Sequence, residues 1–336
     1  MRAFEIRGAF GLPNLVPAER PDPRPGPGQV LVRVRAASLN FRDLLMVQGL
    51  YNPKQPLPLI PCSDGAGEVV ATGSGVTRWK AGDRVCGIFA QQWHSGRPTR
   101  ELLRSTLGGP LDGMLAELAV LDQEGVVRIP DHLGYEEAAT LPCAAVTAWN
   151  ALVTEGGVTA GDTVLVQGTG GVSLFALQFA QLLGARVIAT SSSDEKLARA
   201  REMGAAEGIN YREVPDWGKR AKELTGGLGV DHVVEVGGAG TLAQSLQAVR
   251  FGGTVSLIGN LTGITTELAL THVFMQRVRL QGILVGHRES FEAMNRAIAL
   301  HQLRPVVDRV FAFEEAPATF ELMATGGYFG KIVVSL

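Results

Sequence analysis

Cysteine and histidine are scarce in this chain of 336 residues. It contains three cysteines and six histidines, and Cys62, Cys86 and Cys143 show no C-x-x-C spacing. Because disulfide scaffolds and structural zinc modules need clusters of these residues, the sequence excludes a disulfide framework and a four-cysteine zinc module. Reduced thiols in the cytoplasm are the simplest interpretation.

A charge excess and long apolar runs are also lacking. The net charge is −2, from 31 basic and 33 acidic residues, and no basic run is typical of a surface that binds nucleic acid or lipid. No apolar run approaches membrane-spanning length, and the N-terminus, MRAFEIRGAFG, lacks the apolar core of a signal peptide. We therefore expect a cytoplasmic protein whose partner is a small molecule, not a nucleic acid or a membrane.

Glycine, by contrast, is abundant, with 42 residues, and the most informative glycines lie within residues 163–196. An apolar run, TVLVQ, is followed by the turn GTGGVS, a helical pattern and a second strand pattern, ARVIAT. A glycine turn between a strand and a helix lets a pyrophosphate approach the helix N-terminus, so we predict a dinucleotide site rather than a purely structural turn. The site would include Gly168, Gly170, Gly171 and Val172. Ser173 takes the third fingerprint position, where a small residue is tolerated.

The end of the second strand indicates which dinucleotide binds. An NAD site usually has an acidic residue there, whereas this strand ends at Ser191, Ser192 and Ser193, with Lys196 close behind. Neutral hydroxyls and a cation suit a 2′-phosphate, so NADPH (NADP) is favoured over NADH. The alternative is that Ser192 and Glu195 form a capping box and Lys196 is simply solvated.

The chain is longer than one typical core requires, so we expect two lobes. Before about Cys143, turn residues separate the short strand candidates VLVRVRAASL, GEVVATG, RVCGIF and LAELAVL. After it, strands and helices alternate, which is typical of a parallel sheet flanked by helices. A last segment, from ESFEAMNRAIALH to GKIVVSL, returns to mixed structure and is expected to pack on the first lobe.

These patterns, with several longer motifs, resemble the medium-chain dehydrogenase/reductase superfamily over nearly the whole chain. The motifs include GPGQVLVRVRAASLN, NFRD, GLY, PLIPCSDGAGEVVATGSGVTRWKAGDRV, LPCAAVTAWNAL and GKIV. The resemblance is closest to the zinc-free branch around quinone oxidoreductases and alcohol dehydrogenase-like proteins. It implies an α/β fold in which a GroES-like, β-rich catalytic domain (residues 1–144 and 287–336) joins a Rossmann domain with a doubly wound parallel sheet (residues 145–286). The active site would lie in the cleft between them.

The resemblance also raises the question of zinc. Zinc-dependent members have a catalytic Cys, a His next to a Glu, and a further Cys, whereas the matching positions here hold Asn40, Ser63, Asp64 and Cys143. Since one thiolate without imidazole does not make a zinc site, we expect no metal. The segment 92–114, which replaces the four-cysteine structural zinc loop of those members, is expected to shape specificity.

Without a metal, hydrogen-bond donors would have to polarise the substrate. The resemblance implies Asn40, Tyr51 and Ser63 for this task, with Asp43 of the N-x-x-D motif as an organiser of hydrogen bonds. Structural roles remain open for all of these: Tyr51 packing beneath the cofactor, and Asn40 satisfying buried backbone groups.

Further cofactor contacts follow from the resemblance. Lys196 and Tyr211 match positions that hold the 2′-phosphate in NADPH-using quinone oxidoreductases, although Tyr211 could be a core aromatic. Leu284 and Val285 match the stretch whose backbone meets the nicotinamide amide. Lys331 matches a motif that often reaches the cofactor phosphates, with a solvated lysine as the alternative. Strand ends supply the remaining candidates, Gly237, Gly259 and Asn260.

Together these features predict a zinc-independent, NADPH-dependent oxidoreductase that transfers hydride to an enone, a quinone or a carbonyl of a small hydrophobic substrate. One alternative is an alcohol dehydrogenase in the oxidative direction, and another is an NADPH-binding redox sensor or structural protein without turnover. Family members are commonly dimers through the edge strand of the Rossmann sheet. The segment RLQGILVG would supply that edge, so a homodimer is expected.

Overall fold

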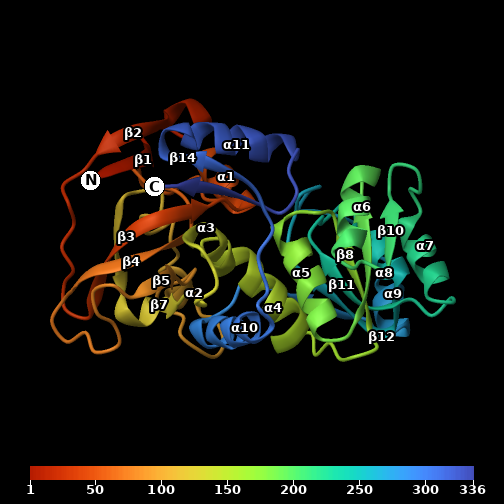
Figure 1. Cartoon of the computed structure of the whole chain (residues 1–336). Coiled ribbons are helices and arrows are strands. Elements are labelled where there is room, and N and C mark those ends of the chain that lie inside the picture. Colours follow the sequence, from red (N-terminus) through yellow and green to blue (C-terminus); the bar gives the residue numbers. More distant parts are fainter. The chain divides into compact units, whose positions relative to one another are not determined.

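The computed structural model describes all residues, 1–336, and the chain divides into two compact units (Figure 1). One unit comprises Met1–Val146 and Gly286–Leu336, and the other comprises Thr147–Val285. We call them the first unit and the second unit. No helix combines the length and the apolar character needed to cross a bilayer.

The second unit is built on a six-stranded sheet in which every neighbouring pair of strands is parallel. Its order, β10-β9-β8-β11-β12-β13, corresponds to 3-2-1-4-5-6 in chain order, which is the Rossmann arrangement. The predicted doubly wound sheet is therefore confirmed. The strands are β8 (Thr163–Gln167), β9 (Arg186–Ser191), β10 (Glu207–Asn210), β11 (Val230–Glu235), β12 (Val249–Leu257) and β13 (Arg279–Gly282).

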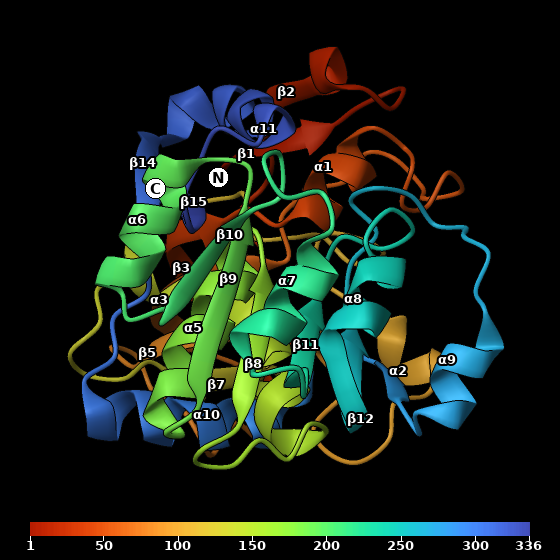
Figure 2. The ribbon, with the colours of Figure 1, turned by 90° about the vertical axis from the view of Figure 1, so that its right-hand side faces the viewer.

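Helices connect these strands and cover both faces of the sheet. Figures 1 and 2 show α5 on one face and α7 and α8 on the other. Between the layers, buried strand residues such as Leu165, Val233 and Val255 pack with helix residues such as Trp217 and Leu246. The helices are α5 (Gly171–Leu182), α6 (Asp194–Glu202), α7 (Trp217–Leu224), α8 (Leu242–Ala248) and α9 (Leu270–Met275).

The first unit is β-rich. A sheet of seven strands has the order β14-β15-β3-β4-β5-β7, with β6 also paired to β3, and β1 and β2 form a separate two-stranded sheet. Strands from the C-terminal segment join this sheet, because β15 pairs with β3, so the expected packing of that segment on the first lobe is confirmed. The strands are β1 (Arg2–Ile6), β2 (Leu15–Glu19), β3 (Gln29–Ser38), β4 (Asp64–Thr72), β5 (Arg84–Gly87), β6 (Leu118–Asp122), β7 (Val126–Arg128), β14 (Val307–Ala312) and β15 (Lys331–Ser335).

Helices of 4 to 14 residues and three 3₁₀ turns fill the connections of the first unit. They are α1 (Phe41–Val47), α2 (Arg100–Leu103), α3 (Tyr135–Ala138), α10 (Arg288–His301), α11 (Ala316–Thr325) and the 3₁₀ turns η1 (Leu12–Asn14), η2 (Gln123–Gly125) and η5 (Phe313–Glu315). One helical stretch carries the chain from the first unit into the second. In it, α4 (Val146–Trp149) lies between two π-helical segments, η3 (Leu141–Ala145) and η4 (Asn150–Thr154). Such π-helical segments occur frequently at functional sites.

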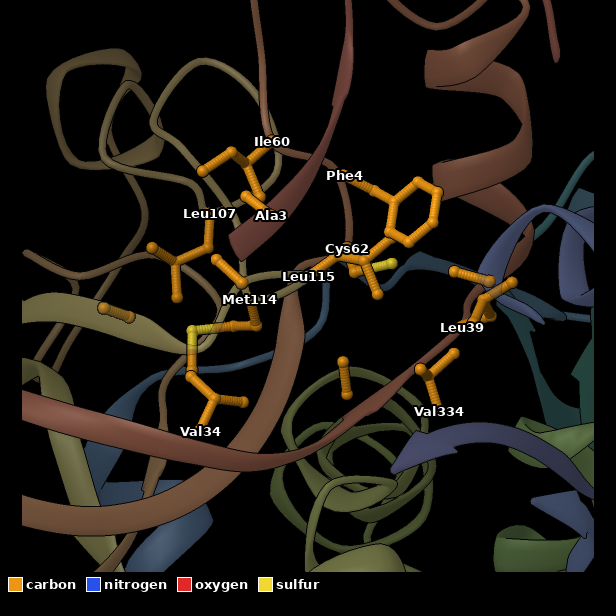
Figure 3. Close-up of a cluster of buried hydrophobic side chains, with 14 of the residues drawn as sticks. Ala3, Phe4, Val34, Leu39, Ile60, Cys62, Leu107, Met114, Leu115 and Val334 are labelled. Carbon is orange, nitrogen blue, oxygen red and sulfur yellow. The ribbon is translucent and has the colours of Figure 1, made fainter. Parts of the chain in front are cut away.

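The core of the first unit supports the segment that contains Ser63 and Asp64. Figure 3 shows Cys62, the residue before them, beside Phe4 and Leu115 in a cluster of buried apolar side chains. Cys62 is fully buried and has a φ of 70°, in the left-handed region. A non-glycine residue is uncommon in this region, so the packing around Cys62 holds a costly backbone turn just before Ser63.

Candidate functional site

The glycine turn after β8 has the geometry of a dinucleotide-binding loop. Gly168 has a φ of 69°, and a Cβ placed on Gly168 or Gly170 would meet only open space. Helix α5 then begins at Gly171 and runs for 12 residues, and Val172 lies in its first turn. The N–H groups of this first turn have no carbonyl partner within the helix, so they can bind an anion.

Ser173 shows how this chain replaces the third glycine of the fingerprint. The residue is buried, and its hydroxyl donates to the carbonyl oxygen of Gln167 at 2.5 Å. At the position where glycine usually allows close packing of helix and strand, this chain therefore joins the two by a hydrogen bond.

The residues predicted to hold a 2′-phosphate lie near the carboxyl ends of β9 and β10. The Tyr211 N–H donates to the Ser191 carbonyl at 3.0 Å, and the Tyr211 side chain is 42% exposed. The alternative of a core aromatic is therefore wrong. The N-cap of α6 is Ser193 and not the predicted Ser192. The Ser193 hydroxyl accepts from the Lys196 N–H at 3.3 Å. Ser192 follows Ser191 directly and is partly exposed.

Two predicted glycines at later strand ends are needed for packing. A Cβ on Gly237 would lie 2.3 Å from Thr241 Oγ1, and one on Gly259 would lie 2.3 Å from the Val236 carbonyl oxygen. Both positions lie at the predicted carboxyl edge of the sheet, next to strands β11 and β12. Asn260, which follows Gly259, is exposed.

Glu235, at the end of β11, organises this edge and was missed by the sequence analysis. It is fully buried, and its Oε1 accepts from the N–H groups of Gly237 and Gly238 at 2.8 and 2.9 Å. Its Oε2 accepts from Gln167 Nε2 at 2.7 Å and from the Ser245 hydroxyl. The carboxylate thus fixes the loop after β11 to the last residue of β8, directly before Gly168.

Leu284 and Val285 follow the edge strand β13. The Leu284 side chain is 41% exposed, whereas Val285 is buried and has a φ of 44°. The strand ends at Gly282, earlier than the pattern RLQGILVG suggests, because this left-handed turn interrupts it.

In the first unit, four predicted residues and Asp64 form one buried cluster, which we call the polar cluster: Asn40, Asp43, Ser63, Asp64 and Lys331. Lys331 Nζ donates to Asn40 Oδ1 at 2.6 Å and to the Leu39 carbonyl at 2.5 Å. Asn40 Nδ2 donates to Ser63 Oγ at 3.4 Å, and the Ser63 hydroxyl donates to Asp64 Oδ1 at 2.7 Å. Hydrogen bonds therefore run unbroken from the ammonium to the Asp64 carboxylate.

Lys331 differs most from its predicted role. The sequence analysis assigned it to the cofactor phosphates or to solvent, but its side chain is only 4% exposed. The solvated alternative is therefore wrong. Its ammonium is bound within the first unit, because Lys331 begins β15, and β15 pairs with β3 immediately before Asn40.

Asp43 and Ser63 occupy interior positions that suit organising roles. Asp43 is fully buried and accepts from the N–H groups of Asn40 at 2.8 Å and Ser63 at 3.3 Å, as expected of an organiser. Ser63 is also fully buried, and its hydroxyl donates a hydrogen bond to Asp64 Oδ1. This geometry differs from the prediction that Ser63 donates directly to a substrate.

Burial shapes the electrostatics of the two aspartates. Burial raises the pKa of Asp64 to about 6, while the Lys331 ammonium opposes this shift. Burial likewise raises the pKa of Asp43, and the charges of Arg42 and Lys331 act against it. Lys331 therefore favours the ionised form of both carboxyl groups, and Arg42 favours that of Asp43.

Arg42 is a second residue that the sequence analysis missed. Its guanidinium donates to Asp43 Oδ1 at 3.2 Å and to the carbonyls of Leu107 and Gly109 at 3.1 and 3.2 Å. The Tyr51 ring lies over it, with the centroid 4.9 Å from Arg42 Cζ. Tyr51 itself is 47% exposed, so its ring is held from below while its other side faces outward.

The polar cluster does not fit a zinc ion. Cys143 is the one sulfur donor at the matching positions, and burial raises the pKa of its thiol, which disfavours the thiolate that zinc requires. Both Asp64 oxygens already accept hydrogen bonds, from Ser63 Oγ and from the Cys143 N–H. Nowhere in the chain do three His, Cys, Asp or Glu side chains form a group that could hold a metal ion.

Family models match most of the chain. The alcohol dehydrogenase GroES-like domain matches residues 26–131, in the first unit, and the zinc-binding dehydrogenase family matches residues 171–299. The second match does not include Asn40, Ser63, Asp64 or Cys143.

Several curated proteins are similar over long stretches. A zinc-type alcohol dehydrogenase-like protein of Schizosaccharomyces pombe is 43% identical over 333 residues, covering 97% of this chain and 96% of the relative. A quinone oxidoreductase of Pseudomonas aeruginosa is 38% identical over 264 residues, covering 78% of this chain and 74% of the relative. An acryloyl-coenzyme A reductase of Metallosphaera sedula is 30% identical over 322 residues, covering 94% of each chain.

Solved structures share the fold as well. An NAD-dependent alcohol dehydrogenase superposes with a TM-score of 0.92 at 37% identity, and a mycobacterial protein solved with NADPH superposes with a TM-score of 0.85 at 28% identity. Each comparison covers 100% of both chains. The sequence resemblance and the expected GroES-like and Rossmann fold are thus confirmed, and the chain belongs to the medium-chain dehydrogenase/reductase superfamily as an oxidoreductase.

Proposed function

We propose that this protein is a zinc-independent, NADPH-dependent reductase that transfers hydride to an enone, a quinone or a carbonyl compound. The polar cluster is the observation that carries the proposal. At the positions where zinc-dependent relatives hold metal ligands, this chain has an amide, a hydroxyl and a carboxylate joined to a buried ammonium. This donor set suits hydrogen bonding, and it is a poor match to the nitrogen and sulfur ligands that zinc prefers.

The strand ends of the second unit support NADPH as the cofactor. Ser191, Ser192, Lys196 and Tyr211 lie around the ends of β9 and β10, and no carboxylate stands at the end of β9 itself. A phosphate would accept hydrogen bonds from serine and tyrosine hydroxyls and would be attracted by a lysine, whereas an acidic residue would repel it. One structural relative was solved with NADPH and another is an NAD-dependent alcohol dehydrogenase, so the proposed preference rests on these residues.

NADPH supplies the hydride, and the residues of the protein would orient the acceptor and stabilise its developing negative charge. Tyr51 is the best-placed proton or hydrogen-bond donor of the first unit, because it is half exposed and Arg42 holds its ring. Asn40 is 9% exposed, and its amide is oriented by Lys331. Asp43, Ser63 and Lys331 would position Asn40 without touching the substrate.

Two relatives favour an acceptor with a conjugated double bond. The names of the quinone oxidoreductase and the acryloyl-coenzyme A reductase both describe substrates in which a carbon–carbon double bond is conjugated to a carbonyl group. Hydride addition to the β-carbon of such a substrate places negative charge on the carbonyl oxygen, where a Tyr51 or Asn40 donor would stabilise it.

The test is consumption of NADPH and of NADH across a panel of enones, quinones, enoyl thioesters and aldehydes. We expect turnover on at least one conjugated acceptor, with a clear preference for NADPH. Turnover restricted to alcohol oxidation with NAD would contradict the proposal and favour the alcohol dehydrogenase alternative. Tight NADPH binding without turnover on any acceptor would also reject it.

A further inference from the structure

We propose that Asn150 is a positioning residue that holds the backbone at Leu284–Val285 in the conformation that receives the nicotinamide carboxamide. This inference rests on the proposed use of a nicotinamide cofactor, and it assigns a task to a residue outside all the predicted contacts. Asn150 is the first residue of the π-helical segment η4, and Val285 lies three residues beyond the end of β13. Both residues belong to the second unit.

One short hydrogen bond joins the two segments. Asn150 Nδ2 donates to the Val285 carbonyl oxygen at 2.6 Å, across a sequence separation of 135 residues. Both side chains are 6% exposed, so water competes little for this bond. Neutral hydrogen bonds from an N–H to a carbonyl oxygen are usually about 2.9 Å long, so this contact is a close one.

Val285 adopts a backbone conformation that its side chain disfavours. Its φ is 44°, in the left-handed region, where a β-branched residue is a genuine outlier. Such conformations persist only where the surrounding structure enforces them, and they concentrate at functional sites. Because Asn150 binds the carbonyl of the same residue, it is the polar group that most directly holds this conformation.

The left-handed turn leaves two backbone groups of one peptide without a partner. Neither the Val285 N–H nor the Leu284 carbonyl makes a hydrogen bond within the chain. The two groups point in opposite directions, because the peptide that they share is trans. A carboxamide carries one acceptor oxygen and two N–H donors, so it can bind whichever of the two groups faces it. The pair also follows the carboxyl end of a parallel strand, where open α/β sheets bind their ligands.

The other end of the Asn150 amide shows that the bond to Val285 is its main role. Asn150 Oδ1 is buried and has no hydrogen-bond partner. A buried acceptor without a partner destabilises the fold, so packing alone would favour an apolar side chain at this position. The single bond to Val285 is the contact that gives the amide a function here.

The experiment compares the affinities of two ligands for the unsubstituted protein and for the Asn150→Ala variant. Titrations would measure the Kd of NADPH and of 2′-phospho-ADP-ribose, which lacks the nicotinamide. We expect a Kd for NADPH about tenfold weaker, as for loss of one ordered neutral hydrogen bond, and an unchanged Kd for the fragment. The control is Asn295→Ala in the first unit. Asn295 Nδ2 donates to the Arg128 carbonyl at 2.9 Å, and Asn295 Oδ1, like Asn150 Oδ1, is buried without a hydrogen-bond partner.

A second variant tests the backbone argument. Glycine adopts a φ of 44° readily, so Val285→Gly in the Asn150→Ala background should recover part of the lost NADPH affinity. Equal weakening of both ligands by Asn150→Ala would indicate a general structural role and overturn the inference, as would unchanged binding of NADPH. If the unsubstituted protein bound neither ligand, the proposed function itself would fail, which is a distinct result.

Discussion

Lys331 is the residue on which the polar cluster depends most. It brings a positive charge to within hydrogen-bond distance of Asn40, near two buried aspartates whose ionised forms it favours. A metal ion would supply positive charge at such a site in zinc-dependent relatives. In this chain Lys331 brings an ammonium to the matching segment, where it donates to Asn40 Oδ1.

Replacing this lysine should be costly. Lys331→Met keeps a similar length but leaves the buried carboxylates with less compensation, so we expect unfolding to become easier by about 3 kcal/mol. The measurement is urea-induced unfolding at neutral pH, with Lys219→Met, an exposed lysine of α7, as the control. Equal stability of the two variants would show that the Lys331 ammonium is not needed in the cluster.

Asp64 should give stability a distinct pH dependence. Its pKa in the folded chain, about 6, lies above the ordinary value of 3.8, so the folded state binds more protons between these values than the unfolded state. The contribution of Asp64 is therefore fully present below pH 3.8 and is lost as the pH rises through about 6, at a cost of about 3 kcal/mol.

The check on this dependence is the free energy of unfolding at several pH values from 4 to 7, for the unsubstituted protein and for Asp64→Asn. Since asparagine does not titrate, the variant should lose less stability across this range, whatever its absolute stability. Parallel curves for the two proteins would mean that Asp64 is not the group responsible.

At the scale of elements, the connection from β8 to α5 is where a single added carbon should affect cofactor binding. Gly168→Ala places a Cβ on a residue with a φ of 69°, in the open space over the turn. We expect NADPH affinity to fall at least about tenfold, because the methyl group would lie in the proposed path of the pyrophosphate and would strain the backbone by about 1 kcal/mol.

A matched control separates strain from steric exclusion. Gly157 has a φ of 66°, and its Cβ position is also open, but it precedes β8 and lies away from the carboxyl edge of the sheet. Gly157→Ala should therefore lower stability similarly and leave the Kd for NADPH unchanged. Equal losses of affinity in both variants would place the pyrophosphate elsewhere.

The elements also show how far the sequence could predict the fold. The strands near residues 30–39 and 84–89 and the alternation after Cys143 were visible because apolar runs and turn residues mark them. The end of β13 at Gly282 was not visible in the sequence, because the apolar pattern continues to Val285, whose left-handed backbone does not fit a strand. The predicted N-cap of α6 differs from the observed one by one residue, because three consecutive serines offer equivalent hydroxyls.

Within the candidate site, motif positions were predictable but their partners were not. Asn40, Ser63 and Asp43 come from two neighbouring motifs, so their proximity could be expected. Lys331 reaches Asn40 from 291 residues away because β15 pairs with β3, a long-range contact that no local pattern encodes. Arg42, Asn150 and Glu235 act through buried hydrogen bonds, and only tertiary structure reveals these bonds.

At the scale of the whole molecule, we propose that the protein is a homodimer through the β13 edge of the second unit. This edge strand has no partner on its outer side, and Leu270, Phe274 and Met275 of α9 are 66%, 62% and 68% exposed. Unpaired strand edges and exposed apolar side chains both favour association.

Light scattering at micromolar concentration should give about twice the chain mass of 35.7 kDa. Phe274→Glu should shift the protein toward the monomer, because it places charge among these apolar side chains. A chain mass for the unsubstituted protein would contradict the dimer.

The proposal that reduction needs no metal is tested by measuring activity and metal content on the same sample. The protein would be incubated with a strong chelator, freed of it, analysed for zinc by mass spectrometry, and assayed for NADPH-dependent reduction of its best conjugated acceptor. We predict less than about one-tenth of a zinc ion per chain, a full rate, and no increase when zinc is returned. Loss of activity on removal of a metal, and its recovery on adding zinc, would show that the protein is a zinc-dependent enzyme.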